Sequence, residues 1–78
     1  MKILCRRIER RMSDRYGDIM VDTNSTIISV KGPIAEDECL LVTDSNTICC
    51  GPQNKIQAIF DAIVDAEKRG DAFFEIKN

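Results

Sequence analysis

The last third of the chain combines a long amphipathic helix pattern with a short strand pattern. Four apolar residues recur at helical spacing and share one face: Ile56, Ile59, Phe60 and Ile63. This pattern predicts a helix at about 54–69, which Gly70 ends because glycine accepts the left-handed conformation. Alternation over 72–77 predicts a strand with Phe74 and Ile76 on one side. A helix with one apolar face needs a sheet to cover it, so this block predicts an α+β domain.

The helix has two candidate starts. Asn54 offers a side-chain cap, with Gln57 completing a capping-box pattern, and it is the favoured start. The alternative places Gly51 at the cap and Pro52 at the first helical position.

The size of the chain limits its core and its location. With 78 residues, 44% of them hydrophobic, residues 1–78 form one domain with a modest core. Because so small a core leaves a thin margin of stability, a homodimer that buries an exposed face is one expectation. The chain has no apolar run long enough to span a membrane, and its first residues become charged too early for a signal peptide. We therefore expect a cytoplasmic protein.

The middle of the chain predicts a small antiparallel sheet made of two hairpins. The first pairs 19–23 with 26–30 around Asn24–Ser25, because this register sorts the apolar residues onto one side. Gly32–Pro33 then ends the strand, and 34–38 forms a linker. The second hairpin pairs 39–43 with 47–50, and its register is ambiguous because both strands are nearly all apolar. The predicted core comprises Ile19, Val21, Ile28, Val30, Leu40, Val42, Ile48, Ile56, Ile59, Phe60, Ile63, Phe74 and Ile76.

The N-terminal segment fits two structures. Leu4, Ile8 and Met12 are spaced four residues apart, which favours a helix, while a strand that places Leu4, Arg6 and Ile8 on one face stays open. Residues 1–15 hold six basic and two acidic side chains, whereas the rest of the chain holds five basic and eleven acidic ones. Such asymmetry bears on partners or on self-association rather than on the fold.

The residue types argue against catalysis. The chain contains no histidine, the commonest general base near neutral pH, and no nucleotide-binding or serine-hydrolase motif. The four cysteines, Cys5, Cys39, Cys49 and Cys50, lack CxxC spacing, so we expect buried thiols rather than zinc ligands. If the adjacent pair lies on a strand, its two side chains point to opposite faces. We expect no enzyme activity, no metal and no cofactor.

Two charged groups suggest partners. The hairpin region carries an acidic group that fits a basic protein or nucleoprotein surface: Asp22, Glu36, Asp37, Glu38 and Asp44. Ordinary solubility is the alternative explanation for these carboxylates. The N-terminal segment carries a basic group suited to nucleic-acid phosphates or to assembly contacts with the acidic remainder: Arg6, Arg7, Arg10, Arg11 and Arg15.

The C-terminal block also carries a resemblance. Its residues Asn54–Ile63 (NKIQAIFDAI) and Gly70–Ile76 (GDAFFEI) resemble sequences found in small phage and mobile-element proteins, including some anti-CRISPR inhibitors. The resemblance covers about a third of the chain and transfers no functional residue. It implies a non-enzymatic inhibitor of a host defence nucleoprotein complex, acting in the host cytoplasm. The alternative is a nucleic-acid-associated accessory protein that uses the arginine-rich segment.

Overall fold

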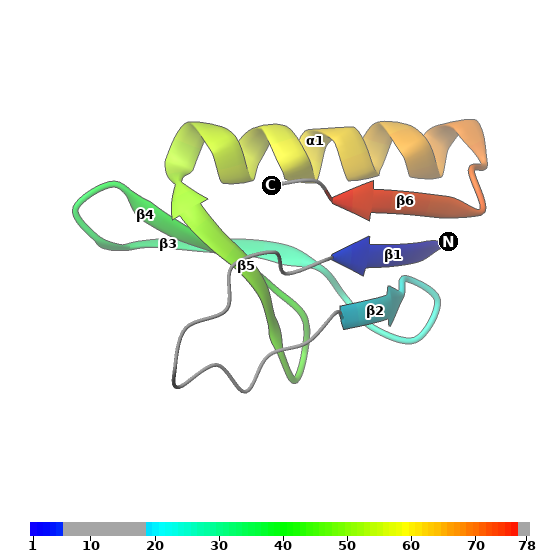
Figure 1. Ribbon diagram of the computed structural model, residues 1–78, viewed down its shortest axis with the longest axis horizontal. Coiled ribbons are helices and arrows are strands. Elements are labelled where there is room, and N and C mark those ends of the chain that lie inside the picture. Colours follow the sequence, from blue (N-terminus) through cyan, green and yellow to red (C-terminus); the bar gives the residue numbers. More distant parts are fainter. Residues whose placement is uncertain (6–18, 77–78) are drawn as a thin grey trace.

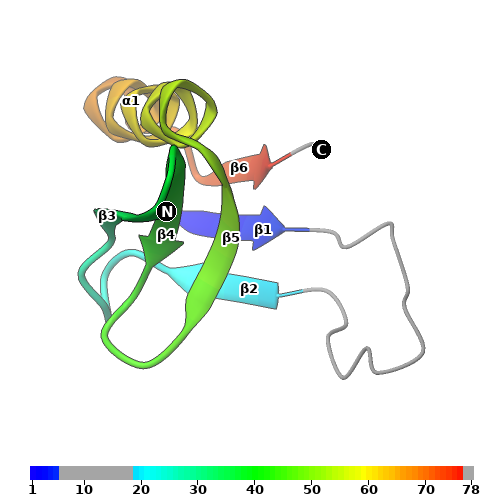
Figure 2. The same ribbon diagram turned by 90° about the vertical axis from the view of Figure 1, so that its left-hand side faces the viewer.

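The computed structural model describes residues 1–5 and 19–76. In chain order the elements are β1 (Lys2–Cys5), β2 (Ile19–Asp22), β3 (Ser29–Ala35), β4 (Glu38–Val42), β5 (Thr47–Pro52), α1 (Gln53–Arg69) and β6 (Phe73–Ile76). The described strands form two three-stranded sheets, ordered β2-β1-β6 and β3-β4-β5. The helix lies above both sheets (Figures 1 and 2), which confirms the α+β class with one main helix.

The core lies between the two sheets and the helix. One cluster of buried residues joins every described element except β3: Ile3, Cys5, Val21, Cys39, Leu41, Ile48, Ile56, Ile63 and Ile76. Ile59, Phe60 and Phe74 are partly buried against it, so the predicted apolar face of the helix is confirmed. The last strand also follows its prediction, since Phe74 and Ile76 face the core while Phe73 and Glu75 are exposed.

The favoured helix at the N-terminus is wrong for the residues that the structure describes there. Lys2–Cys5 form a central strand, antiparallel to β2 and parallel to β6. Ile3 and Cys5 point into the core, at 0% and 1% exposure, whereas Lys2 and Leu4 face the other side. The strand forms because two neighbours satisfy its backbone, which a local helix pattern cannot anticipate. Residues 6–15 lie outside the described part of the chain.

The first predicted hairpin is also wrong in its pairing. The predicted partner of β2 was the segment 26–30, but Val21 pairs with Ile3 of β1. A turn does follow β2, where Ser25 N–H donates to the Asp22 carbonyl at 3.1 Å, yet the chain then moves to the other sheet. Alternation assigns the faces of a strand but not its neighbour, because one apolar face fits many partners.

The third strand continues beyond its predicted end. β3 passes through Gly32 and the cis-bonded Pro33 to Ala35, with an irregular register between Lys31 and Ala35. It therefore includes part of the predicted linker at 34–38 and turns directly into β4. Proline is tolerated here because β3 is an edge strand that needs no donor on its outer side.

The second predicted hairpin is confirmed, and the structure resolves its ambiguous register. β4 pairs antiparallel with β5, and Thr43 N–H donates to the Asn46 carbonyl at 2.7 Å in the connecting turn. Cys39 and Leu41 face the core, whereas the predicted core residues Leu40 and Val42 are half-buried on the other face. Both faces are apolar, so only contact with the helix and the first sheet decides between them.

The helix agrees with its predicted range, but its start differs. Its N-cap is Pro52, with no side-chain cap, and Asn54 Oδ1 instead accepts from Lys55 N–H. The Gln53 N–H donates to the Asp37 carbonyl at 2.9 Å, so the turn before β4 satisfies the first helical amide. Gly70 ends the helix at φ 78°, as predicted.

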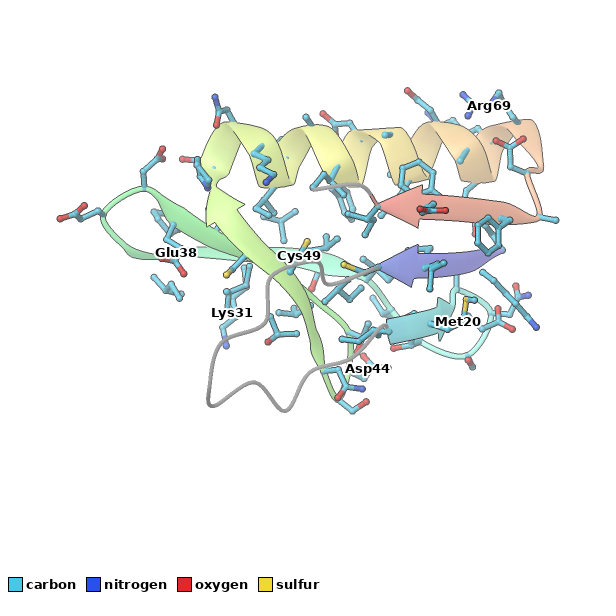
Figure 3. All side chains as sticks on the ribbon, in the orientation of Figure 1. Met20, Lys31, Glu38, Asp44, Cys49 and Arg69 are labelled. Atoms are coloured by element: carbon cyan, nitrogen blue, oxygen red, sulfur yellow. The ribbon has the colours of Figure 1, made fainter. Side chains whose placement is uncertain are left out.

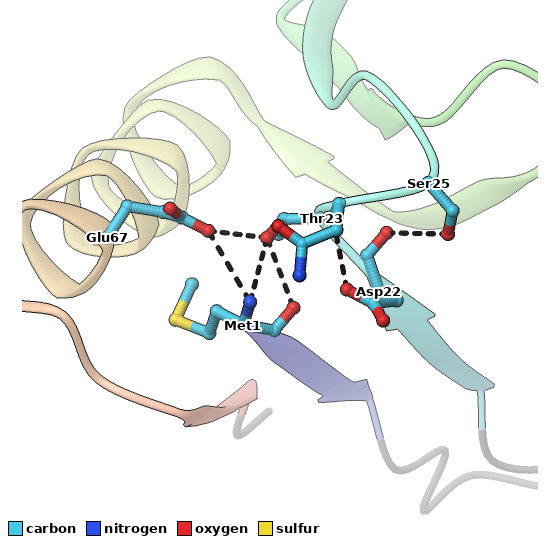
Figure 4. A network of polar contacts seen from close by, with 6 residues as sticks. Met1, Asp22, Thr23, Ser25 and Glu67 are labelled. Carbon is cyan, nitrogen blue, oxygen red and sulfur yellow. Dashed lines mark hydrogen bonds and ion pairs between the residues drawn. The ribbon is translucent and has the colours of Figure 1, made fainter.

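A polar network joins the first residue to the end of β2 and to the helix (Figure 4). Thr23 N–H donates to the Met1 carbonyl at 2.9 Å, and the Met1 ammonium donates to Thr23 Oγ1 at 3.1 Å. The Thr23 hydroxyl in turn donates to Glu67 Oε1, which lies 3.8 Å from the same ammonium. One threonine therefore connects β1, β2 and α1.

Truncation of Leu41 should destabilise the fold far more than truncation of its neighbour. Leu41→Ala leaves a cavity in a fully buried site and should lower the free energy of unfolding by about 2–5 kcal/mol. The matched Leu40→Ala removes a half-buried side chain and should cost only about 1 kcal/mol. Urea denaturation of both variants measures this difference. A larger loss for Leu40→Ala would overturn the observed register of β4.

Removal of the Thr23 hydroxyl should weaken the connection between the first residue and the helix. Thr23→Val keeps the side-chain volume but deletes the hydrogen bonds of the hydroxyl, and should lower the free energy of unfolding by about 1 kcal/mol. Ser25→Ala is the matched control, because its hydroxyl donates to the Asp22 carbonyl in an exposed turn. Its expected effect is within about 0.5 kcal/mol. Equal losses for the two variants in urea denaturation would contradict the role of the network.

Candidate protein-binding surface

Three consecutive carboxylates gather where β3 turns into β4. Ala35 pairs with Glu38, so Glu36 and Asp37 are the two central residues of the turn. All three acidic side chains are exposed. The turn projects beyond the helix at one end of the molecule (Figure 1). We call Glu36, Asp37 and Glu38 the acidic tip.

The acidic tip lies against the start of the helix. Glu38 is the register partner of Pro52, and Asp37 accepts the first helical N–H through its carbonyl. The tip residues line an open depression of about 370 Å³ together with Gly51 and Pro52. Three acidic residues, a glycine and a proline therefore line the depression.

The tip also contributes to the start of the helix through its backbone. The N-cap of α1 has no side-chain bond, and the Asp37 carbonyl accepts the first helical N–H instead.

Glu36 occupies a backbone conformation that does not suit its residue type. Its φ is 46°, the only positive φ among the described residues other than glycine. Two-residue hairpin turns of this kind favour glycine or asparagine, and the left-handed conformation costs other residues about 1–2 kcal/mol. The tip therefore carries a glutamate where local stability would favour another residue.

The five predicted acidic residues do not form one surface. Asp44 lies in the turn between β4 and β5, beyond the end of β4 that is opposite to Glu38 (Figure 3). Its N–H donates to Thr26 Oγ1 at 3.3 Å. Asp22 ends β2, where its Oδ1 accepts from Asn24 N–H at 3.0 Å. The structure thus brings three of the five together and places the other two elsewhere.

The predicted arginines Arg6, Arg7, Arg10, Arg11 and Arg15 lie outside the described residues. Within residues 1–5 and 19–76 there are ten acidic and five basic side chains. All five basic side chains are exposed, and Arg69 pairs with Asp71 at 3.0 Å. This part of the protein is therefore strongly acidic, which favours a basic partner surface.

The large apolar side chains that are exposed in the described part of the chain are Met20, Ile27, Ile34 and Phe73. Ile34, 54% exposed, lies on β3 two residues before the acidic tip. Met20, 53% exposed, is the register partner of the half-buried Leu4, whereas Phe73, 49% exposed, is the register partner of Lys2. Ile34 adds an apolar contact beside the acidic tip, and Met20 and Phe73 are exposed on the outer face of the first sheet, where Glu75 is the partner of Leu4 on β6. Sequence reasoning missed Ile34 because it assigned 34–38 to a linker.

Of the three described edge strands that precede the helix, β2, β3 and β5, the first two are poorly suited to pairing with another strand. β3 carries Lys31, Pro33 and an irregular register, all of which disrupt edge pairing. In β2 the Asp22 carbonyl already accepts from the N–H and the hydroxyl of Ser25, each at 3.1 Å. A partner would therefore contact side chains rather than extend either of these edges.

The cysteines lie in different environments. Cys5 and Cys39 are buried in the core, Cys49 is half-buried against it, and Cys50 is exposed on the opposite face of β5. The prediction that Cys49 and Cys50 point to opposite faces of a strand is confirmed. The prediction that the thiols are buried is wrong for Cys50. Among the described residues, no three or more cysteine, aspartate or glutamate side chains are arranged so that they could hold a metal ion together.

Comparison with known proteins identifies no relative: no family model, curated protein or solved structure matches the chain. Within residues 1–5 and 19–76, no helix has the length and apolarity that a membrane span requires.

Thiol labelling should separate the four cysteines. Cys50 should react with Ellman's reagent within seconds to minutes, and Cys49 more slowly, because the thiolate must reach solvent. Cys5 and Cys39 should react only on unfolding. Cys50→Ser should remove the fast phase, whereas Cys39→Ser should leave it unchanged. Fast labelling of all four in the native protein would contradict the observed burial.

Replacement of Glu36 should reveal its backbone cost. Glu36→Asn and Glu36→Gln remove the same charge, but only asparagine tolerates positive φ well. The asparagine variant should be more stable than the glutamine variant by about 0.5–1 kcal/mol. Thermal and urea denaturation of the pair measure this difference. Equal stability of the two variants would argue against the left-handed turn.

Proposed function

We propose that the chain is a non-enzymatic protein-binding module that contacts a basic partner surface through the acidic tip. The observation that carries this proposal is the position of Glu36, Asp37 and Glu38, three exposed carboxylates on a projecting turn. Exposed Ile34 beside them offers an apolar contact, and the adjoining depression has room for a long basic side chain. An interface of this composition gains orientation and association rate from charge and affinity from apolar burial.

The residue inventory supports binding rather than catalysis. The chain has no histidine, so neither a thiol nor a hydroxyl has an imidazole to activate it. The three carboxylates of the acidic tip are exposed on a turn and are not enclosed in a cleft.

The narrower proposal names the partner class. A host defence nucleoprotein complex of the CRISPR type binds nucleic acid along basic surfaces. An acidic tip on a small protein would compete for such a surface, and the resemblance to small phage proteins points the same way. In this proposal the protein is a phage-type inhibitor that acts in the host cytoplasm.

Charge neutralisation at the acidic tip should weaken partner binding. The test variant combines Glu36→Gln, Asp37→Asn and Glu38→Gln. The matched control combines Asp44→Asn, Asp61→Asn and Asp65→Asn, which change the net charge equally at exposed positions elsewhere. A partner purified by cross-linking and affinity capture from the host should bind the tip variant about tenfold more weakly, a change of about 1.4 kcal/mol. The control should bind within about twofold of wild type, and added salt should reduce the difference.

One further measurement accompanies this test. Urea denaturation must show that the tip variant is folded at the assay temperature, because the backbone of the tip satisfies the first helical amide. Wild-type affinity in the tip variant would overturn the proposed surface.

The alternative function, nucleic-acid association through the arginine-rich segment, is tested with the same protein. Duplex and single-stranded nucleic acid are titrated at low and moderate salt, together with a variant carrying glutamine at Arg6, Arg7, Arg10 and Arg11. Tight binding with a steep salt slope that this variant loses would support the alternative. Light scattering of the same variant tests whether the arginines instead serve a homodimer.

A further inference from the structure

We draw no further inference here: the strongest candidate, the outer face of the β2-β1-β6 sheet with its exposed Met20 and Phe73, carries no proposal because nothing in the described residues shows what covers it.

Discussion

The two ladders of β1 are the constraint on which the remaining structure depends. Thr23 N–H donates to the Met1 carbonyl on one side, and Lys2 N–H donates to the Ala72 carbonyl on the other. The second contact joins segments that are almost the whole chain apart. Parallel pairing of β1 with β6 requires a long connection, and α1 supplies its last part. The helix must therefore bring the chain back to the first sheet, so that β6 can lie beside β1. Its apolar face packs against both sheets and completes the core.

The turn at Gly70 reverses the direction of the chain between the end of the helix and β6. Gly70 N–H donates to the Glu67 carbonyl and Asp71 N–H to the Ala66 carbonyl, each at 3.0 Å, which is the pattern of a Schellman motif. Only three residues, 70–72, separate the end of the helix from β6. Ala66 is fully buried at this corner, so the last turn of the helix can approach the sheet closely.

The acidic tip has a structural role through its backbone and an exposed surface through its side chains. Its backbone satisfies the first amide of α1, while its carboxylates remain exposed and line the depression beside Pro52. The sequence offered Asn54 as a side-chain cap, but the helix begins before it, at Gln53. Because the acceptor for the first helical N–H comes from the β3–β4 turn, this hydrogen bond ties the tip to the start of the helix. A fixed charged turn suits recognition, since less conformational entropy is lost on binding.

The sequence by itself determined the elements whose pattern is local. Apolar spacing defined α1 and its buried face, Gly70 defined its end, and alternation defined β6. Two short apolar runs separated by polar residues defined the β4–β5 hairpin, although not its register. It also contained the three neighbouring carboxylates of the acidic tip, because they are consecutive in the chain. These features depend on the helical and strand periods, and both can be read from a few adjacent residues.

Only the tertiary structure decided which strands are neighbours. It made β1 a central strand, gave β2 to β1 rather than to β3, and selected Leu41 over Leu40 for the core. It also moved Asp22 and Asp44 away from the acidic tip. Strand pairing joins residues far apart in the chain, and an apolar face accepts any apolar partner, so alternation leaves the choice open. Which strands become neighbours is decided when the apolar faces of all the strands and of the helix pack into one small core.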